Sequence, residues 1–176
     1  MALPILETAT YELTLPSSNV QVKYRPFLVK EEKILLLAME SDNAGEITKA
    51  LKDIVHACTF GSINVDLLPT FDLEYIFLNV RAKSVGEVAK LKLLCPDDKE
   101  TYAQVELDLS KVNVEVDDEH TNEIVVNDKI KMVLAYPTID SFDPNQDAKT
   151  LKTQPLFDVI GNVVYEIYEG ETVHKA

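Results

Sequence analysis

Residues 68–86 constrain the fold of this chain more than any other stretch, because apolar side chains recur on two sides of one predicted helix. Pro69 and Thr70 are typical of a helix start, Lys83 suits a last turn, and Gly86 suits a helix stop. At about 100° per residue, one side carries Leu73, Ile76, Phe77, Val80 and Ser84. The opposite side carries Phe71, Tyr75, Leu78, Ala82 and Val85.

A surface helix ordinarily has one apolar side, so two such sides predict a helix that packs against neighbours in two directions. We interpret residues 68–86 as the central core helix of the fold, because an apolar stripe normally means burial. The alternative is that one stripe is left free for another subunit. Periodicity alone does not separate these two interpretations.

The residues before this helix predict a β-hairpin and two more helices. Residues 11–15 and 20–24 alternate between polar and apolar side chains across a turn that contains Pro16. Residues 28–40 predict a helix that is apolar around much of its girth, and we expect it to be a second core element. Residues 46–58 predict a third helix. Residues 1–86 are therefore expected to form an N-terminal hairpin with a three-helix core.

After Gly86 the apolar period changes from 3.6 to 2. Strands are predicted at 88–94 and 102–107, and again on either side of Asn127 and Asp128, so residues 87–137 are expected to form a β-hairpin module. Residues 138–176 are expected to hold a polar loop and then a helix, because apolar residues recur at helical spacing over 155–168. The predicted fold class is α+β.

Composition restricts the classes of partner. The formal net charge is −13, with 30 acidic and 17 basic side chains, so binding to nucleic acid or to an anionic membrane is not expected. Solubility is the simplest role of this charge, and steering toward a basic partner is the alternative. The longest apolar run, at 34–39, is far too short to span a bilayer, and residues 1–4 lack signal-peptide features. We expect a soluble protein of a reducing cytoplasm.

Two acidic loops resemble metal sites only in part. Asp143, Asn145 and Asp147 copy the first half of a calcium loop, but Ala148 replaces the required glycine and Gln154 replaces the bidentate glutamate. We therefore expect a solvated loop. Residues 117–120 are the densest acidic run, and the pattern is typical of an exposed connection between strands.

The cysteines do not predict a metal site either. His56 and Cys58 are two apart on a predicted helix and face different directions, so Cys58 is expected to be a core thiol. Cys95 stands at a hairpin tip, as in a zinc ribbon, but Asp98 occupies the place of the second cysteine. We thus expect a zinc-ribbon-like hairpin without metal. The sequence holds no phosphate loop or nucleophile elbow, and predicts no catalytic, cofactor-binding or metal-binding residue.

Two long strings carry a resemblance to a known family. FLVKEEKILLLAMES at 27–41 and LPTFDLEYIFLNVRAKSVGE at 68–87 resemble baseplate proteins of T4-like contractile-tailed phages, whose members are baseplate hub subunits or hub-assembly chaperones. The stretches LPSS at 15–18 and YRPF at 24–27 fit the same pattern, and the similarity is strongest over residues 3–95. Family members usually continue beyond the end of this chain, so the resemblance implies a truncated or a naturally shorter member.

The resemblance implies a non-catalytic role in assembling the tail baseplate hub, in the host cytoplasm or in the virion. The expected partners are other tail and hub proteins, with no cofactor; whether the chain forms an oligomer is left open. The alternatives are a metal-dependent enzyme that uses the acidic loops and an unrelated acidic adaptor. We expect the partner-binding surface around Leu156, Ile160 and Val164, because the chain ends before any element visibly covers that predicted helix.

Overall fold

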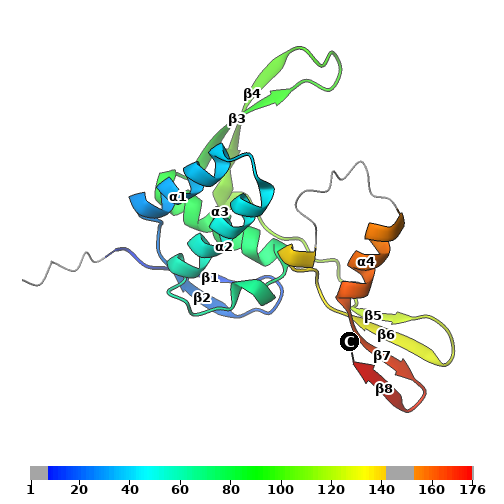
Figure 1. Ribbon diagram of the computed structural model, residues 1–176. Helices are drawn as coiled ribbons and strands as arrows, with labels where there is room; N and C mark the ends of the chain where they lie inside the picture. The colour runs from blue at the N-terminus through cyan, green and yellow to red at the C-terminus, as the bar shows by residue number, and fades with distance from the viewer. Residues whose placement is uncertain (1–7, 142–152, 176) are drawn as a thin grey trace, which may run out of the picture.

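The structure is a computed structural model that describes residues 8–141 and 153–175, and its elements form an α+β fold as the sequence predicts. Figure 1 shows a helical body, a hairpin that extends away from it, and a C-terminal sheet with its own helix. Short 3-10 turns lie at Val65–Leu67 within the helical body, at Leu109–Lys111 after the hairpin and at Ile139–Ser141 before the C-terminal helix.

The helical body contains the N-terminal hairpin and three helices. Strands β1 (Tyr11–Thr14) and β2 (Gln21–Tyr24) pair antiparallel beside helices α1 (Val29–Glu40), α2 (Ala44–Cys58) and α3 (Thr70–Val85). The predicted hairpin and all three predicted helices are therefore confirmed. Their main core consists of Leu13, Leu15, Val22, Tyr24, Ile54, Val55, Cys58, Val65, Leu73, Ile76 and Val80.

Helix α3 is packed in two directions, which confirms its interpretation as the central core helix. On one side Leu73, Ile76 and Val80 are fully buried in the main core. On the opposite side Ala82 packs in a second, smaller cluster with Ala89 and Leu109. The helix stops at Gly86, whose φ of +131° is rarely adopted by other residues.

Helix α1 differs from its prediction as a core element. Only Glu31 and Ala38 are buried, and Leu35 is half-buried against the main core. The reason is position rather than sequence: α1 lies at the margin of the body and packs mainly against α2. Within the part of the chain that the structure describes, no second layer covers its outer side.

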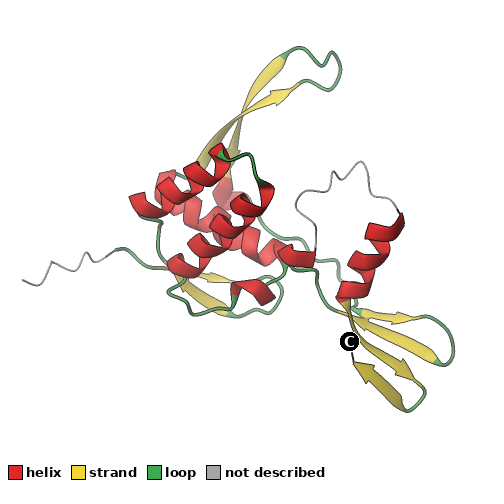
Figure 2. Ribbon diagram, viewed as in Figure 1, coloured by secondary structure: helices red, strands yellow, loops and turns green. Residues whose placement is uncertain are grey.

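The strands of residues 87–137 enter two separate sheets (Figure 2). Strands β3 (Val88–Leu94) and β4 (Tyr102–Asp108) form a two-stranded ribbon of their own. Strands β5 (Glu123–Val125) and β6 (Ile130–Leu134) join β7 (Val164–Glu169) and β8 (Thr172–Lys175) in an antiparallel sheet ordered β5-β6-β7-β8. Hydrogen bonds between β6 and β7 thus link the predicted second and third segments.

The prediction of one helix over residues 155–168 is correct up to Val163 and wrong from Val164 onward. Helix α4 (Thr153–Val163) ends before Val164, and β7 begins there. The β-branched and aromatic residues of 164–168 suit either a helix face or a strand in isolation. The free edge of β6 decides for the strand, because Leu134 pairs with Val164 across the sheet. Tertiary pairing therefore overrides the local period.

The C-terminal part is attached to the helical body beside the start of α3. The backbone N–H of Thr70 donates to the carbonyl of Pro137 at 3.1 Å, and Pro69 bridges to Thr138. The Phe71 ring meets the Tyr136 ring edge-on, with centroids 5.0 Å apart. The N-terminal end of the central helix thus anchors the segment that follows β6.

Replacing Ile76 by Ala should lower the free energy of unfolding by about 3 kcal/mol, because the side chain is fully buried in the main core and would leave a cavity. Urea unfolding followed by circular dichroism would measure this difference. Glu74→Ala is the matched control, since Glu74 is exposed on the same helix and should change stability by less than about 0.5 kcal/mol. Equal effects of the two substitutions would contradict burial of this side of α3 in the main core.

Candidate interaction surfaces

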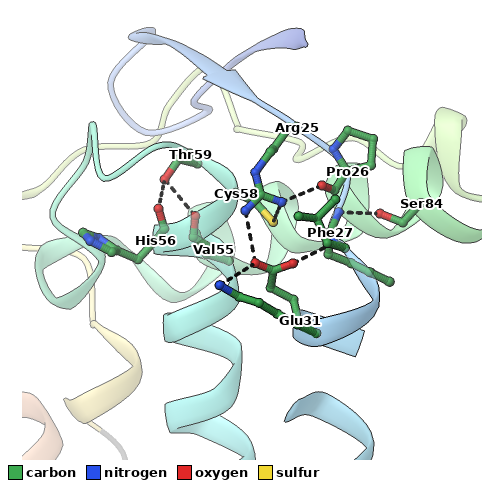
Figure 3. A network of polar contacts seen from close by, with 11 residues as sticks. Arg25, Pro26, Phe27, Glu31, Val55, His56, Cys58, Thr59 and Ser84 are labelled. Carbon is green, nitrogen blue, oxygen red and sulfur yellow. Dashed lines mark hydrogen bonds and ion pairs between the residues drawn. The ribbon is translucent and has the colours of Figure 1, made fainter. Parts of the chain in front are cut away.

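One buried charge cluster joins β2, α1 and α2 (Figure 3). The Arg25 guanidinium lies 3.1 Å from Glu31 Oε1, and the Glu31 side chain is only 2% exposed. The same guanidinium donates to the Pro26 carbonyl at 2.9 Å and lies 3.9 Å from Cys58 Sγ. The other Glu31 oxygen accepts the N–H of Leu28 at 2.7 Å and so caps the start of α1.

The contacts of the cluster set the charge states of Glu31 and Cys58. Burial acts to raise the pKa of Glu31, but the hydrogen bonds from Arg25 and from the Leu28 N–H outweigh it, so this pKa lies below its usual value. Burial raises the pKa of the Cys58 thiol to about 11, which keeps it protonated and unreactive. Cys58 is therefore a core thiol, as predicted. The cluster fixes the direction in which α1 leaves β2.

A consequence of this fixed direction is an apolar surface on the outside of α1, which we call the α1 outer surface. Its exposed side chains are Val29, Leu36 and Met39. Ile34 and Leu37 are exposed as well, but they line a hollow between α1 and α2. Val29 is 81% exposed and Met39 is 58% exposed, values that are unusual for so many large apolar residues on one helix. The sequence predicted apolar residues around much of this helix, but it did not predict which side would be exposed to solvent.

A second apolar surface lies on the β3–β4 ribbon. The ribbon extends away from the helical body in Figure 1, and most of its apolar side chains are exposed. The strand alternation predicted the two strands and their turn, and both are confirmed. The exposure of the ribbon depends on which elements pack against it, and local sequence does not reveal that.

The residues predicted to bind a partner do not share one helix face. Ile160 lies on α4 and is 44% exposed, close in sequence to the exposed Phe157. Val164 instead opens β7 and is half-buried. Leu156 belongs to α4, but its side chain lies outside the described residues. An exposed apolar patch on α4 is thus present around Phe157 and Ile160.

The acidic loops form no cation site in the described residues. Asp143, Asn145 and Asp147 lie outside them. Residues 117–120 are exposed, as expected of a connection between strands, and Asp117 accepts the N–H of Glu119 within its own turn. Among residues 8–141 and 153–175 no three His, Cys, Asp or Glu side chains converge on a point where a metal could bind.

Two hollows of the described surface contain polar contacts between distant segments. A cavity of about 500 Å³ is lined mainly by apolar atoms beside His120, Tyr136 and Tyr165. His120 stacks on Tyr136 with ring centroids 5.6 Å apart, and its Nε2 lies 2.9 Å from the tyrosine hydroxyl. A larger, more polar hollow contains Lys52, which pairs with Asp66 and Asp140. These contacts join segments that are distant in the sequence.

No helix among the described residues has the length and apolar character that crossing a membrane requires.

Glu31→Gln should destabilise the protein by about 3 kcal/mol at pH 7, because it leaves the Arg25 charge buried without its partner. Since the folded pKa of Glu31 lies below its ordinary value of 4.5, its contribution is complete above pH 4.5 and declines as pH falls toward the folded pKa. The stability gap between wild type and variant should therefore narrow below pH 4.5. Urea unfolding at several pH values measures this gap, and a gap independent of pH would contradict the charge pairing.

Comparison with known proteins gives one match. A family model described as T4 bacteriophage base plate protein matches residues 8–176, nearly the whole chain. No curated protein and no solved structure matches the chain. The resemblance carried by the two strings of 27–41 and 68–87 is confirmed at the level of the family, and it extends through the C-terminal sheet.

Proposed function

We propose, because this chain belongs to the T4 bacteriophage base plate protein family, that it helps to assemble the hub of the tail baseplate through protein–protein contacts and without catalysis. The observation that carries the proposal is the amount of apolar surface left open on α1, on the β3–β4 ribbon and on α4. Monomeric proteins rarely expose large contiguous apolar patches, and such patches mark interaction sites.

The family match indicates a baseplate protein, and we propose in addition that its place is the hub. Two versions of the role remain distinct. A hub subunit would stay in the virion, whereas an assembly chaperone would bind hub components in the host cytoplasm and then leave. The net charge of −13 favours binding to a basic partner in either version, because opposite charges speed association. We expect no cofactor and no contact with nucleic acid.

The α1 outer surface is the first contact that we propose. The surface belongs to a helix whose start is fixed by the Arg25–Glu31 ion pair, so its apolar side chains are presented without further ordering. The patch around Leu156, Ile160 and Val164 is a second proposed contact. Its weakest member is Val164, which pairs with Leu134 across β6 and β7 and also supports the sheet.

Leu36→Gln combined with Met39→Gln should weaken binding to a hub protein by about tenfold or more, because both side chains are exposed apolar members of the α1 outer surface. Pull-down and biolayer interferometry with each purified tail protein of the same phage would measure the change. Glu32→Gln with Lys33→Gln is the matched control on the same helix. Leu156, Ile160 and Val164 replaced together by Ser would test the α4 patch in the same assay.

Stability must be measured beside binding. The α1 variant should unfold within about 0.5 kcal/mol of wild type, since its side chains are exposed and glutamine is a good helix former. Unchanged binding by the α1 variant would contradict this contact. A loss of folding would show that the helix is covered within the chain after all.

The chain should co-purify with hub proteins from infected cells, because assembly requires contact with them in either version of the role. Mass spectrometry of purified virions then separates the two versions. Presence at a stoichiometry comparable to that of other baseplate proteins identifies a subunit, and absence identifies a transient chaperone. A chain found in neither hub complexes nor virions would contradict the proposed function.

A further inference from the structure

The register of the β3–β4 ribbon sorts its side chains onto two chemically different faces. Cross-strand partners in an antiparallel pair lie on the same face. One face, which we call the ribbon apolar face, consists of the pairs Ala89–Leu107, Leu91–Val105 and Leu93–Ala103. The other face carries the Lys90–Glu106 ion pair at 3.5 Å, and Lys92 Nζ lies 5.7 Å from the centre of the Tyr102 ring. This second face also carries the exposed Val88 and the Leu94–Tyr102 pair, but its middle is charged and polar, whereas the middle of the first face is entirely apolar.

The ribbon apolar face is covered at its base and open beyond it. Ala89 is buried against Ala82 of α3 and against Leu109, so the base is part of the second core cluster. Farther out, Leu91 and Val105 are each 40% exposed and Leu93 is 50% exposed. A two-stranded hairpin is at best marginally stable in water when its apolar face has no partner. The face therefore continues a core that the described chain does not complete.

The tip of the ribbon is acidic and ordered. Asp97, Asp98 and Glu100 stand there against a single lysine, Lys99. Asp98 accepts the hydroxyl of Thr101 and the backbone N–H groups of Glu100 and Thr101, the latter two at 3.0 Å. The hydroxyl bond and then these N–H bonds lower the pKa of Asp98 to about 2, so the carboxylate stays charged. The tip thus presents fixed negative charge at the end of an apolar face.

We infer that the β3–β4 ribbon inserts into an apolar groove of another baseplate protein, with its acidic tip against lysine or arginine side chains at the end of that groove. The inference rests on the proposed function and names the chemistry of one partner. Charge complementarity selects that partner, because an acidic tip on a chain of net charge −13 favours a basic receiving surface. The apolar face supplies the contact area and the tip sets the direction of insertion.

A second copy of this chain is a poor occupant. Two ribbons stacked face to face would cover on the order of 250 Å² per copy, given the rise per residue and the strand spacing of a sheet. Stable interfaces cover about 800 Å² per partner. Each copy would also bring the same net charge of −13 and the same acidic tip. A groove can contact the face, both ribbon edges and the tip together.

Full-length chain carrying Leu91→Thr and Leu93→Thr tests the inference, with Lys90→Thr and Lys92→Thr as the matched control on the opposite face of the same strand. Threonine keeps the strand preference and removes apolar length. Binding is measured by biolayer interferometry against each purified baseplate protein of the same phage. We expect the affinity of the apolar-face variant for its partner to fall by about thirtyfold or more. The affinity of the control should stay within about threefold of wild type.

Asp97→Asn with Glu100→Gln tests the tip, and Asp98 is kept because it holds the turn. Association should slow severalfold, and its dependence on salt should decrease, because long-range attraction to the basic groove is lost. Unfolding by urea and sedimentation of every variant show whether it is folded and monomeric.

Several outcomes would overturn the inference while leaving the proposed function intact. One such outcome is that the apolar-face variant binds a baseplate protein as tightly as wild type does. Another is that the variant and its control lose affinity equally. Wild-type chain that dimerises through the ribbon in sedimentation would identify a second copy as the occupant. If no baseplate protein binds wild-type chain at all, the proposed function itself fails.

Discussion

The packing of α3 in two directions is the constraint on which the rest of the structure depends. Leu73, Ile76 and Val80 close the main core, and the opposite side of the same helix holds the base of the ribbon and the attachment of the C-terminal sheet. One helix therefore joins three otherwise separate parts. The end of α3 positions the ribbon, and the start of α3 positions the C-terminal part together with the Lys52–Asp140 ion pair and Ile139.

A buried ion pair adds a second constraint with a different purpose. A buried ion pair is weak evidence for added stability, because the cost of removing two charges from water offsets their attraction. The Arg25–Glu31 pair uses both carboxylate oxygens, one for the guanidinium and one for the Leu28 N–H at the start of α1. Its geometry therefore fixes the angle of α1, and the same angle leaves the α1 outer surface open to solvent.

The open apolar surfaces and the acidic charge agree with assembly through contacts. The chain belongs to a phage base plate family, and apolar side chains are exposed on α1, on the ribbon and on α4 rather than gathered around a reactive cavity. Apolar area supplies binding free energy, whereas net charge governs the rate and choice of partner. A net charge of −13 favours association with basic neighbours.

The sequence by itself determined the central helix, the N-terminal hairpin, the ribbon strands and the α+β class, because each depends on a local period of apolar residues. Two sequence strings also determined the family. Only the tertiary structure decided that much of α1 is exposed. Apolar residues around most of a helix do not indicate which other elements will pack against it. The tertiary structure likewise decided that residues from Val164 onward form β7, because the free edge of β6 supplied hydrogen-bond partners. Burial and strand pairing are properties of distant residues, and local sequence does not contain them.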